Sequence, residues 1–228
     1  IKAHANRNKF VNQEVAVEAL IYQESLEKEI DEVRAKVEKK PFKKSEEKIV
    51  KNNKVSTTDS DSGWFHKGEH KEVFAYSAQV ACDPNCWVLG YTADRSNLHD
   101  SRTFFDLYAK LIQKFPEIDT VVADAGYKTP AIAKKLIDDG RTGLFPYTRP
   151  RGKKGLFRKQ DYSYDYLSNT YICPNGKQLI YKTTRRDGYQ EYRTTKTNCI
   201  TCPLLTQCTL SQTKQKTVFR HIWQLYLD

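Results

Sequence analysis

The sequence predicts an α/β fold in which a mixed sheet is flanked by helices and extended by a helical insertion and a small basic, cysteine-bearing module. Three observations lead to this prediction. A hairpin pattern over residues 73–91 is followed by alternating helical and strand patterns up to residue 147, the order of a mixed sheet with helices on its faces. A long helical repeat precedes the hairpin. Four of the six cysteines and all of the excess positive charge follow residue 140.

The composition is that of one ordinary domain, or of a domain with an appendage. Of the 228 residues 39% are hydrophobic, with 14 Tyr, 10 Phe and 3 Trp, which excludes wholesale disorder, collagenous proteins and tiny disulfide-stapled proteins. No apolar run is long enough to span a membrane, and residues 1–10 lack the apolar segment of a signal peptide. We therefore expect a cytoplasmic protein with no membrane partner.

The start of the chain is unusual. The sequence contains no methionine and begins with Ile1, a residue too bulky to follow ordinary removal of an initiator methionine. We interpret the chain as a fragment of a longer protein, cut at its N-terminus.

A helical pattern runs from Gln13 to Lys40, where apolar residues recur at spacings of three and four until Pro41 follows. A single amphipathic stripe of this length usually packs on a partner helix, so self-association through residues 13–40 is one expectation. Residues 39–54, rich in Lys and Glu and poor in apolar residues, are typical of a solvated linker.

The next segments predict a hairpin followed by a helix. Residues 73–82 alternate in polarity, the turn sequence Asp-Pro-Asn follows, and residues 86–91 return as a second strand. Cys82 and Cys86 flank this turn, and we interpret them as core. Residues 97–115 then have helical periodicity, with Asp100 or Ser101 placed to cap the start.

A strand, a helix and a further strand complete this region. Residues 118–123 form a β-branched run that predicts a buried strand. Thr129 and Pro130 open a helix that Gly140 ends, with Ile132, Leu136 and Ile137 facing inward. Residues 143–147 predict one more strand, at an edge because Pro146 cannot donate a ladder hydrogen bond.

Asp124 is the most informative single residue. It directly follows the strand pattern Val121-Val122-Ala123 and precedes Ala-Gly-Tyr, and ligands of open α/β sheets gather at the carboxyl ends of strands. A carboxylate there suits a hard divalent cation for phosphodiester chemistry. The alternative interpretation is a carboxylate that only caps the following turn through Gly126.

The segment from Val121 to Tyr127, with Asn97-Leu98-His99-Asp100 and the run from Phe65 to Tyr76 before it, resembles the DDE transposases of bacterial insertion sequences. Among these, the group with an insertion-sequence-4-like catalytic domain is the most similar. The resemblance implies an RNase H-like fold, double-stranded DNA as partner and a bacterial, nucleoid-associated location. It also implies an Asp-Asp-Glu triad that holds two Mg²⁺ or Mn²⁺ ions for cleavage and strand transfer.

Carried over residue by residue, the resemblance matches Asp124 to the second aspartate. The first aspartate belongs on a strand just before a segment similar to residues 1–6, and the glutamate belongs on a helix beyond residue 228. Asp59, Asp61 and Asp100 are the plausible substitutes for the first aspartate, but the first two lie in a polar segment and Asp100 better fits a helix cap. Our hypothesis is that this polypeptide alone cannot cut or join DNA, because a lone carboxylate binds Mg²⁺ weakly.

The later cysteines form a second candidate site. Cys173 is followed after 25 residues by Cys199 and Cys202, and then by Cys208. A Cys-x-x-Cys pair with two further cysteines is compatible with a zinc ribbon, in which Zn²⁺ stabilises a domain too small for its own core. Reduced cysteines that only pack are the open alternative.

The positive charge is concentrated in the last part of the chain. Residues 141–228 hold 16 Lys and Arg against 5 Asp and Glu, whereas residues 1–140 hold 22 against 23. Cations interleaved with tyrosines suit a DNA groove, although a basic surface that only keeps the protein soluble would look the same. The candidate DNA-binding residues are Lys128, Arg149, Arg151, Lys153, Lys154, Arg158, Lys159, Arg185 and Arg186.

These patterns predict an RNase H-like core at 1–9 and 56–150, a helical insertion with a charged linker at 10–55, and a basic cysteine module at 151–215. Residues 216–228 would begin the C-terminal part of the core. The expected function is that of an insertion-sequence transposase, catalytically incomplete as this chain stands. The alternatives are a non-catalytic zinc-ribbon DNA-binding protein derived from such an element, and an interaction module that works through residues 13–40.

Overall fold

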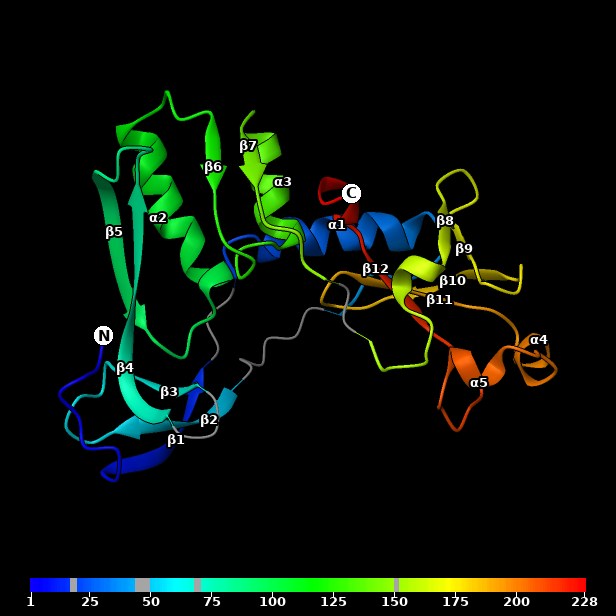
Figure 1. Ribbon diagram of the computed structural model, residues 1–228, viewed down its shortest axis with the longest axis horizontal. Helices are drawn as coiled ribbons and strands as arrows, with labels where there is room; N and C mark the ends of the chain where they lie inside the picture. The colour runs from blue at the N-terminus through cyan, green and yellow to red at the C-terminus, as the bar shows by residue number, and fades with distance from the viewer. Residues whose placement is uncertain (17–19, 44–49, 68–70, 150–151) are drawn as a thin grey trace. The chain divides into compact units, whose positions relative to one another are not determined.

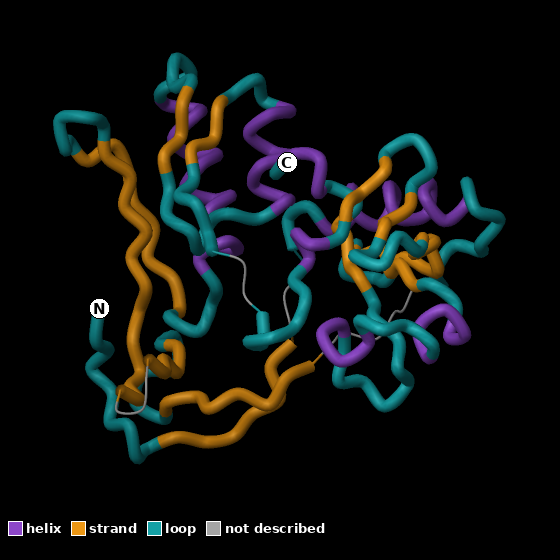
Figure 2. Tube along the Cα trace, turned by 45° about the vertical axis from the view of Figure 1, so that its right-hand side comes forward, coloured by secondary structure: helices purple, strands orange, loops and turns teal. Residues whose placement is uncertain are grey.

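The computed structural model describes residues 1–16, 20–43, 50–67, 71–149 and 152–228. The chain divides into two compact units, which Figure 1 shows in colours that run along the sequence. Unit 1 comprises Ile1–Gln23 and Lys44–Pro146, and unit 2 comprises Glu24–Lys43 and Tyr147–Asp228. Both contain strands and helices (Figure 2), so the chain is a mixed α/β protein with several sheets. No helix of the described residues is long and apolar enough to cross a bilayer.

The predicted hairpin is confirmed in unit 1. Strands β4 (Lys71–Cys82) and β5 (Val88–Arg95) pair antiparallel, and β3 (Gly63–Lys67) adds a third strand on β4. Helix α2 (Asp100–Lys114) lies along β4 and β5 (Figure 1) and buries Phe104, Leu107 and Tyr108. Its N-cap is His99, where Asp100 or Ser101 was predicted, because the ring Nδ1 of His99 accepts the backbone N–H of Ser101 at 3.2 Å.

Strands β6 (Thr120–Val122) and β7 (Thr142–Leu144) are parallel neighbours joined through helix α3 (Pro130–Asp138). The predicted start of α3 is confirmed, since Thr129 Oγ1 accepts the N–H of Ile132 at 3.3 Å and Pro130 opens the helix. Two expectations were wrong. Ile137 is 51% exposed, and Val122, in the strand predicted to be buried, is 76% exposed.

The single mixed sheet that the sequence predicts is not what the described residues form. Strands β6 and β7 make a two-stranded sheet, separate from the β3-β4-β5 sheet. The first half of β4 pairs with β3 and its second half, from Tyr76, pairs with β5. No described strand joins the two sheets. The order of elements along the chain is therefore as predicted, but each of these two sheets pairs only strands that are near one another in the sequence.

Residues 10–16 and 50–56 are strands, although the sequence analysis places them in a helical insertion and its linker. They form strands β1 (Phe10–Ala16) and β2 (Val50–Ser56), paired antiparallel over seven residues each. Strand pairing satisfies the backbone groups of two segments that are far apart in the sequence, a tertiary effect that overrides local propensity. Residues 17–19 and 44–49 of the predicted helix and linker lie outside the described residues.

Helix α1 (Gln23–Ala35) is shorter than the helix predicted over Gln13–Lys40, since the other described residues of that range are not helical. It buries Leu26 and Ile30, at 3% and 1% exposure, whereas Val37 is 39% exposed beyond its end. Glu29 Oε2 accepts a hydrogen bond from the indole Nε1 of Trp223 at 2.5 Å. The apolar face of α1 is therefore used within unit 2, and self-association through residues 13–40 stays a prediction.

The sheet of unit 2 has five antiparallel strands in the order β12-β11-β10-β9-β8. They are β8 (Ser163–Asp165), β9 (Thr170–Ile172), β10 (Gln178–Thr184), β11 (Tyr189–Arg193) and β12 (Val218–His221). Helices α4 (Lys196–Ile200) and α5 (Leu205–Cys208) lie between β11 and β12, and the 3₁₀ turns η1 (Lys159–Asp161) and η2 (Gln224–Tyr226) flank the sheet in sequence. Strand β12, which the sequence analysis assigned to the catalytic core, pairs with β11 in this sheet.

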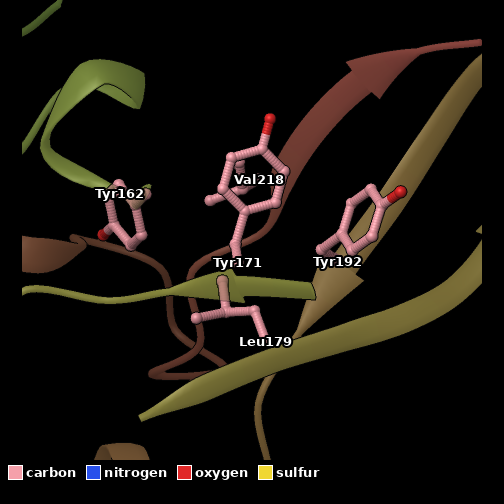
Figure 3. Packing of buried hydrophobic residues seen from close by; sticks show 5 residues of the cluster. All are labelled: Tyr162, Tyr171, Leu179, Tyr192 and Val218. Atoms are coloured by element: carbon pink, nitrogen blue, oxygen red, sulfur yellow. The ribbon is translucent and has the colours of Figure 1, made fainter. Parts of the chain in front are cut away.

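The core of unit 2 is built mainly from tyrosines (Figure 3). Tyr162, Tyr171 and Tyr192 pack with Leu179 and Val218, and none is more than 4% exposed. Tyr171 and Tyr192 meet edge to face with centroids 5.2 Å apart, an arrangement that aromatic quadrupoles favour. The tyrosines interleaved with basic residues are thus partly structural.

Candidate functional site

Asp124 lies at the carboxyl end of β6, as the sequence predicts, in a tight turn. Its Oδ1 accepts the backbone N–H of Gly126 at 2.7 Å, and its carbonyl oxygen accepts the N–H of Tyr127 at 3.2 Å. The carboxylate is exposed. The turn-capping role therefore exists, but it uses one carboxylate oxygen, and Oδ2 has no hydrogen-bond partner within the described ranges.

A second carboxylate, that of Asp100, borders the same turn. A Cβ atom built on Gly126 would stand 3.0 Å from Asp124 Oδ1 and 3.3 Å from Asp100 Oδ2. A side chain at this position would require the two carboxylates to shift by a few tenths of an ångström. The first residue of α2 and the loop after β6 therefore lie close together.

Gln79 of β4 links these two elements through hydrogen bonds of its side chain. Its side chain is only 6% exposed, and its Nε2 donates to Asp100 Oδ1 at 3.2 Å and to Ser77 Oγ at 3.1 Å. Its Oε1 accepts a hydrogen bond from the hydroxyl of Tyr127. Burial, with the negative charges of Asp100 and Asp124 nearby, raises the pKa of Tyr127 to about 12, so the hydroxyl stays a donor at neutral pH.

Sequence reasoning missed Gln79, because it is one polar position on an alternating strand and nothing local marks it as buried. Of the three substitutes considered for the first aspartate, Asp100 is the one placed beside Asp124. Asp59 instead accepts a hydrogen bond from Tyr76 at 2.6 Å, and Asp61 lies 3.6 Å from Arg95. Within the described residues, no three His, Cys, Asp or Glu side chains are already arranged to hold a metal ion.

The four later cysteines come together in unit 2. Cys173, Cys199, Cys202 and Cys208 all line one cavity of about 30 Å³. Burial, together with the neighbouring thiols, raises the pKa of Cys199. Cys82 and Cys86, which we expected in the core, are exposed at the tip of the β4-β5 hairpin.

Part of the predicted DNA-binding set also converges. Lys153, Arg158 and Lys159 line an open cavity of about 600 Å³ together with Lys216, which the sequence analysis did not select. Phe157 and Phe219 are among its apolar walls, and none of the described lining residues is acidic. Hereafter this surface is called the basic groove.

The other selected cations are placed differently. Arg185 pairs with Asp187 at 3.2 Å, and Arg186 donates to the carbonyl oxygen of Lys43 at 3.0 Å, so both have partners within unit 2. Arg149 and Lys154 are exposed. Lys128, in unit 1, lies 3.5 Å from the carbonyl oxygen of Pro146. Arg151 lies outside the described residues.

Comparison with known proteins gives one finding. The family model described as the transposase DDE domain matches residues 30–219, which is most of the chain. No curated protein and no solved structure matches.

Proposed function

Because this chain belongs to the transposase DDE domain family and is thus a transposase, we propose that it binds double-stranded DNA and supplies Asp124 as a metal ligand for cleavage and strand transfer. Asp124 and its surroundings carry this proposal. The carboxylate is exposed, follows a strand directly, and is held by the N–H of Gly126 with its second oxygen open. Carboxylate oxygen is the donor that Mg²⁺ and Mn²⁺ prefer.

The metal ions of this family would supply Lewis acidity at the scissile phosphate. The chain's own residues support that chemistry by position. Gln79 holds Asp100 and Tyr127, and these flank the Asp124 turn, so the carboxylate is presented in one orientation. With Asp124 and Asp100 as the two adjacent carboxylates, ligation is incomplete, and we propose that the chain alone does not cut DNA.

The first segment of the chain lies alongside β4. Ile1 and Ala3 pair antiparallel with Tyr76 and Phe74 of β4, with the N–H of Tyr76 bonded to the carbonyl oxygen of Ile1 at 2.7 Å. An extended residue placed before Ile1 would continue along β4 toward Gln79. The first aspartate of the family's triad is expected just before a segment like residues 1–6. It would then lie beside the part of β4 that carries Gln79, the residue that contacts Asp100 and Tyr127.

DNA binding is proposed for the basic groove. Four cations around one hollow, with no described acidic residue in its lining, give a strongly positive local potential. Such a surface favours phosphates, and the aromatic walls offer faces on which a base or sugar can pack. This supports weakly sequence-specific binding to the DNA backbone.

The binding test uses fluorescence anisotropy with a labelled duplex at several salt concentrations. If four phosphate contacts form, the slope of log K against log salt is about −3 to −4. The Lys153→Ala/Arg158→Ala variant should lower that slope by about 2 units. The control, Lys28→Ala/Lys36→Ala, removes the same charge from exposed positions on or next to α1. Affinity that does not change with salt, or equal losses in both variants, would rule out the groove.

The cleavage test compares two proteins in a nicking assay with Mg²⁺ or Mn²⁺. The chain of residues 1–228 should not nick DNA. A version extended by an aspartate-bearing strand before Ile1 and a glutamate-bearing helix after Asp228 should nick it. Asp124→Asn should abolish that activity, and Asp119→Asn, a change of the same kind before β6, should not. Nicking by the unextended chain that depends on Asp124 would show that the ligand set is already complete.

One specific observation supports an alternative function. The four cysteines around one cavity suit a non-catalytic zinc-ribbon DNA-binding protein derived from a transposable element. It predicts salt-dependent DNA binding without cleavage even in the extended version.

A further inference from the structure

The six cysteines separate into two groups by position in the fold. Cys82 and Cys86 lie exposed at the hairpin tip of unit 1. The other four come from three segments of unit 2: the turn after β9, the α4 region and the end of α5. All four line the same cavity of about 30 Å³, which is room for a particle of roughly water size. We call this the cysteine cavity.

Polar groups of unit 2 lie against two of these sulfur atoms. The backbone N–H of Lys177 points to Cys173 Sγ at 3.4 Å, and the hydroxyl of Tyr162 lies 3.1 Å from Cys208 Sγ. The side chains of Lys177 and Lys216 also line the cavity.

The segment that carries three of the cysteines is only lightly packed. Helices α4 and α5 have five and four residues, and neither contains a buried residue. Cys208, at the end of α5, and Cys173, after β9, pack against the buried tyrosine core of the sheet, whereas no such contact is described for Cys199 and Cys202. A link between Cys173 and the α4-α5 segment would therefore attach a weakly packed segment to a well-packed sheet.

We propose that Cys173, Cys199, Cys202 and Cys208 bind one Zn²⁺ ion in the cysteine cavity. Four thiolates are a donor set of structural zinc sites, and Zn–S distances there are about 2.3 Å. Because the described side chains are not yet arranged around an ion, binding draws the thiols inward, and the short, unburied α4 and α5 can move to allow it. The metal then stabilises residues 196–208. This inference does not depend on the proposed function.

The first experiment measures metal in the full chain, purified under reducing conditions with zinc supplied. Elemental analysis should give one zinc per chain. Cobalt in place of zinc should give the intense visible bands of a tetrahedral site and a thiolate-to-metal charge-transfer band. A thiol reagent should modify Cys82 and Cys86 readily and the other four only after chelation.

Two variants make the test specific. Cys199→Ser/Cys202→Ser should lose the zinc and the cobalt spectrum, and Cys82→Ser/Cys86→Ser should keep both. If the first variant fails to fold, the test uses the wild-type chain instead. Its zinc is removed with a chelator and returned stepwise, and circular dichroism checks that the protein stays folded. Folded, reduced wild-type protein that takes up no zinc overturns the proposal, and so does zinc lost equally in both variants. A disulfide between cavity cysteines in protein kept under reducing conditions would also overturn it.

Discussion

Gln79 Nε2 donates a hydrogen bond to Asp100 Oδ1 at 3.2 Å, and this contact joins the middle of β4 to the first residue of α2. Through its Oε1, Gln79 also holds the hydroxyl of Tyr127, three residues after Asp124. The arrangement explains how a loop with small residues can present a carboxylate in a defined orientation. It also gives Asp100 a role other than the helix cap that its position in the sequence suggests.

We expect Gln79→Leu to destabilise unit 1. Leucine has a similar size but leaves the Tyr127 hydroxyl and one Asp100 oxygen without their partner, and each such loss costs about 1–3 kcal/mol. Denaturant unfolding should show a lower free energy of unfolding by about 2 kcal/mol. Gln113→Leu, at an exposed position of α2, should have almost no effect. Equal stability of the two variants would mean that Gln79 does not hold the loop.

The second prediction compares two glycines with positive φ. Gly188 has φ +82°, and a Cβ there would stand 2.6 Å from His221 Nε2 and 3.0 Å from Leu26 Cδ1. Gly140 has φ +71°, with nothing within 4 Å of its Cβ position. Both Ala variants incur backbone strain of about 1 kcal/mol or more.

Gly188→Ala must in addition displace a buried histidine, so its free energy of unfolding should fall by about 2 kcal/mol more than that of Gly140→Ala. Thermal unfolding of the two variants measures the difference. Similar melting temperatures would show that His221 and Leu26 do not pack on Gly188 as described.

The third prediction concerns pH. Burial, helped by the charge of Lys159, lowers the pKa of His221 to about 4, while nearby Asp187 opposes the shift. The ring Nδ1 accepts the N–H of Trp223 at 3.1 Å, which requires that nitrogen to be unprotonated. The native state therefore binds this proton less readily than the unfolded state does.

The stability that His221 contributes is fully present above its ordinary pKa of 6.5 and is lost as the pH falls toward 4. The loss over this window is about 3 kcal/mol. His221→Asn keeps a side-chain acceptor but does not titrate, so its melting temperature should depend less on pH between 6.5 and 4. His66→Asn, at an exposed position of β3, should behave as the wild type. A wild-type melting temperature that is flat over this window would contradict the assignment.

The fourth prediction tests the start of α3. Thr129→Ala removes the cap on the N–H of Ile132 and should lower the free energy of unfolding by about 1 kcal/mol. Thr129→Ser keeps the hydroxyl and should retain most of that stability. The denaturation midpoint distinguishes the two variants. If Thr129→Ser lost as much stability as Thr129→Ala, the threonine methyl group and not its hydroxyl would be the stabilising group.

Local chemistry was sufficient to predict some elements. The hairpin of β4 and β5 follows from alternation and a turn sequence, and α3 follows from a capping threonine, an initial proline and a terminal glycine. The same kind of reasoning failed for β1 and β2. Their backbones are satisfied by each other across more than thirty intervening residues, and no local pattern contains that information.

By itself the sequence determined the transposase family, the carboxylate at the end of β6, and the separation of a basic, cysteine-bearing part from a neutral one. These are properties of residue identity and near spacing. Only the tertiary structure decided that Asp100 borders Asp124, that buried Gln79 links Asp100 to Tyr127, and that four cysteines from three segments share one cavity. The reason is physical: such neighbours are set by how strands pair and helices pack over long separations, where the burial of apolar side chains and the satisfaction of backbone hydrogen bonds outweigh local preference.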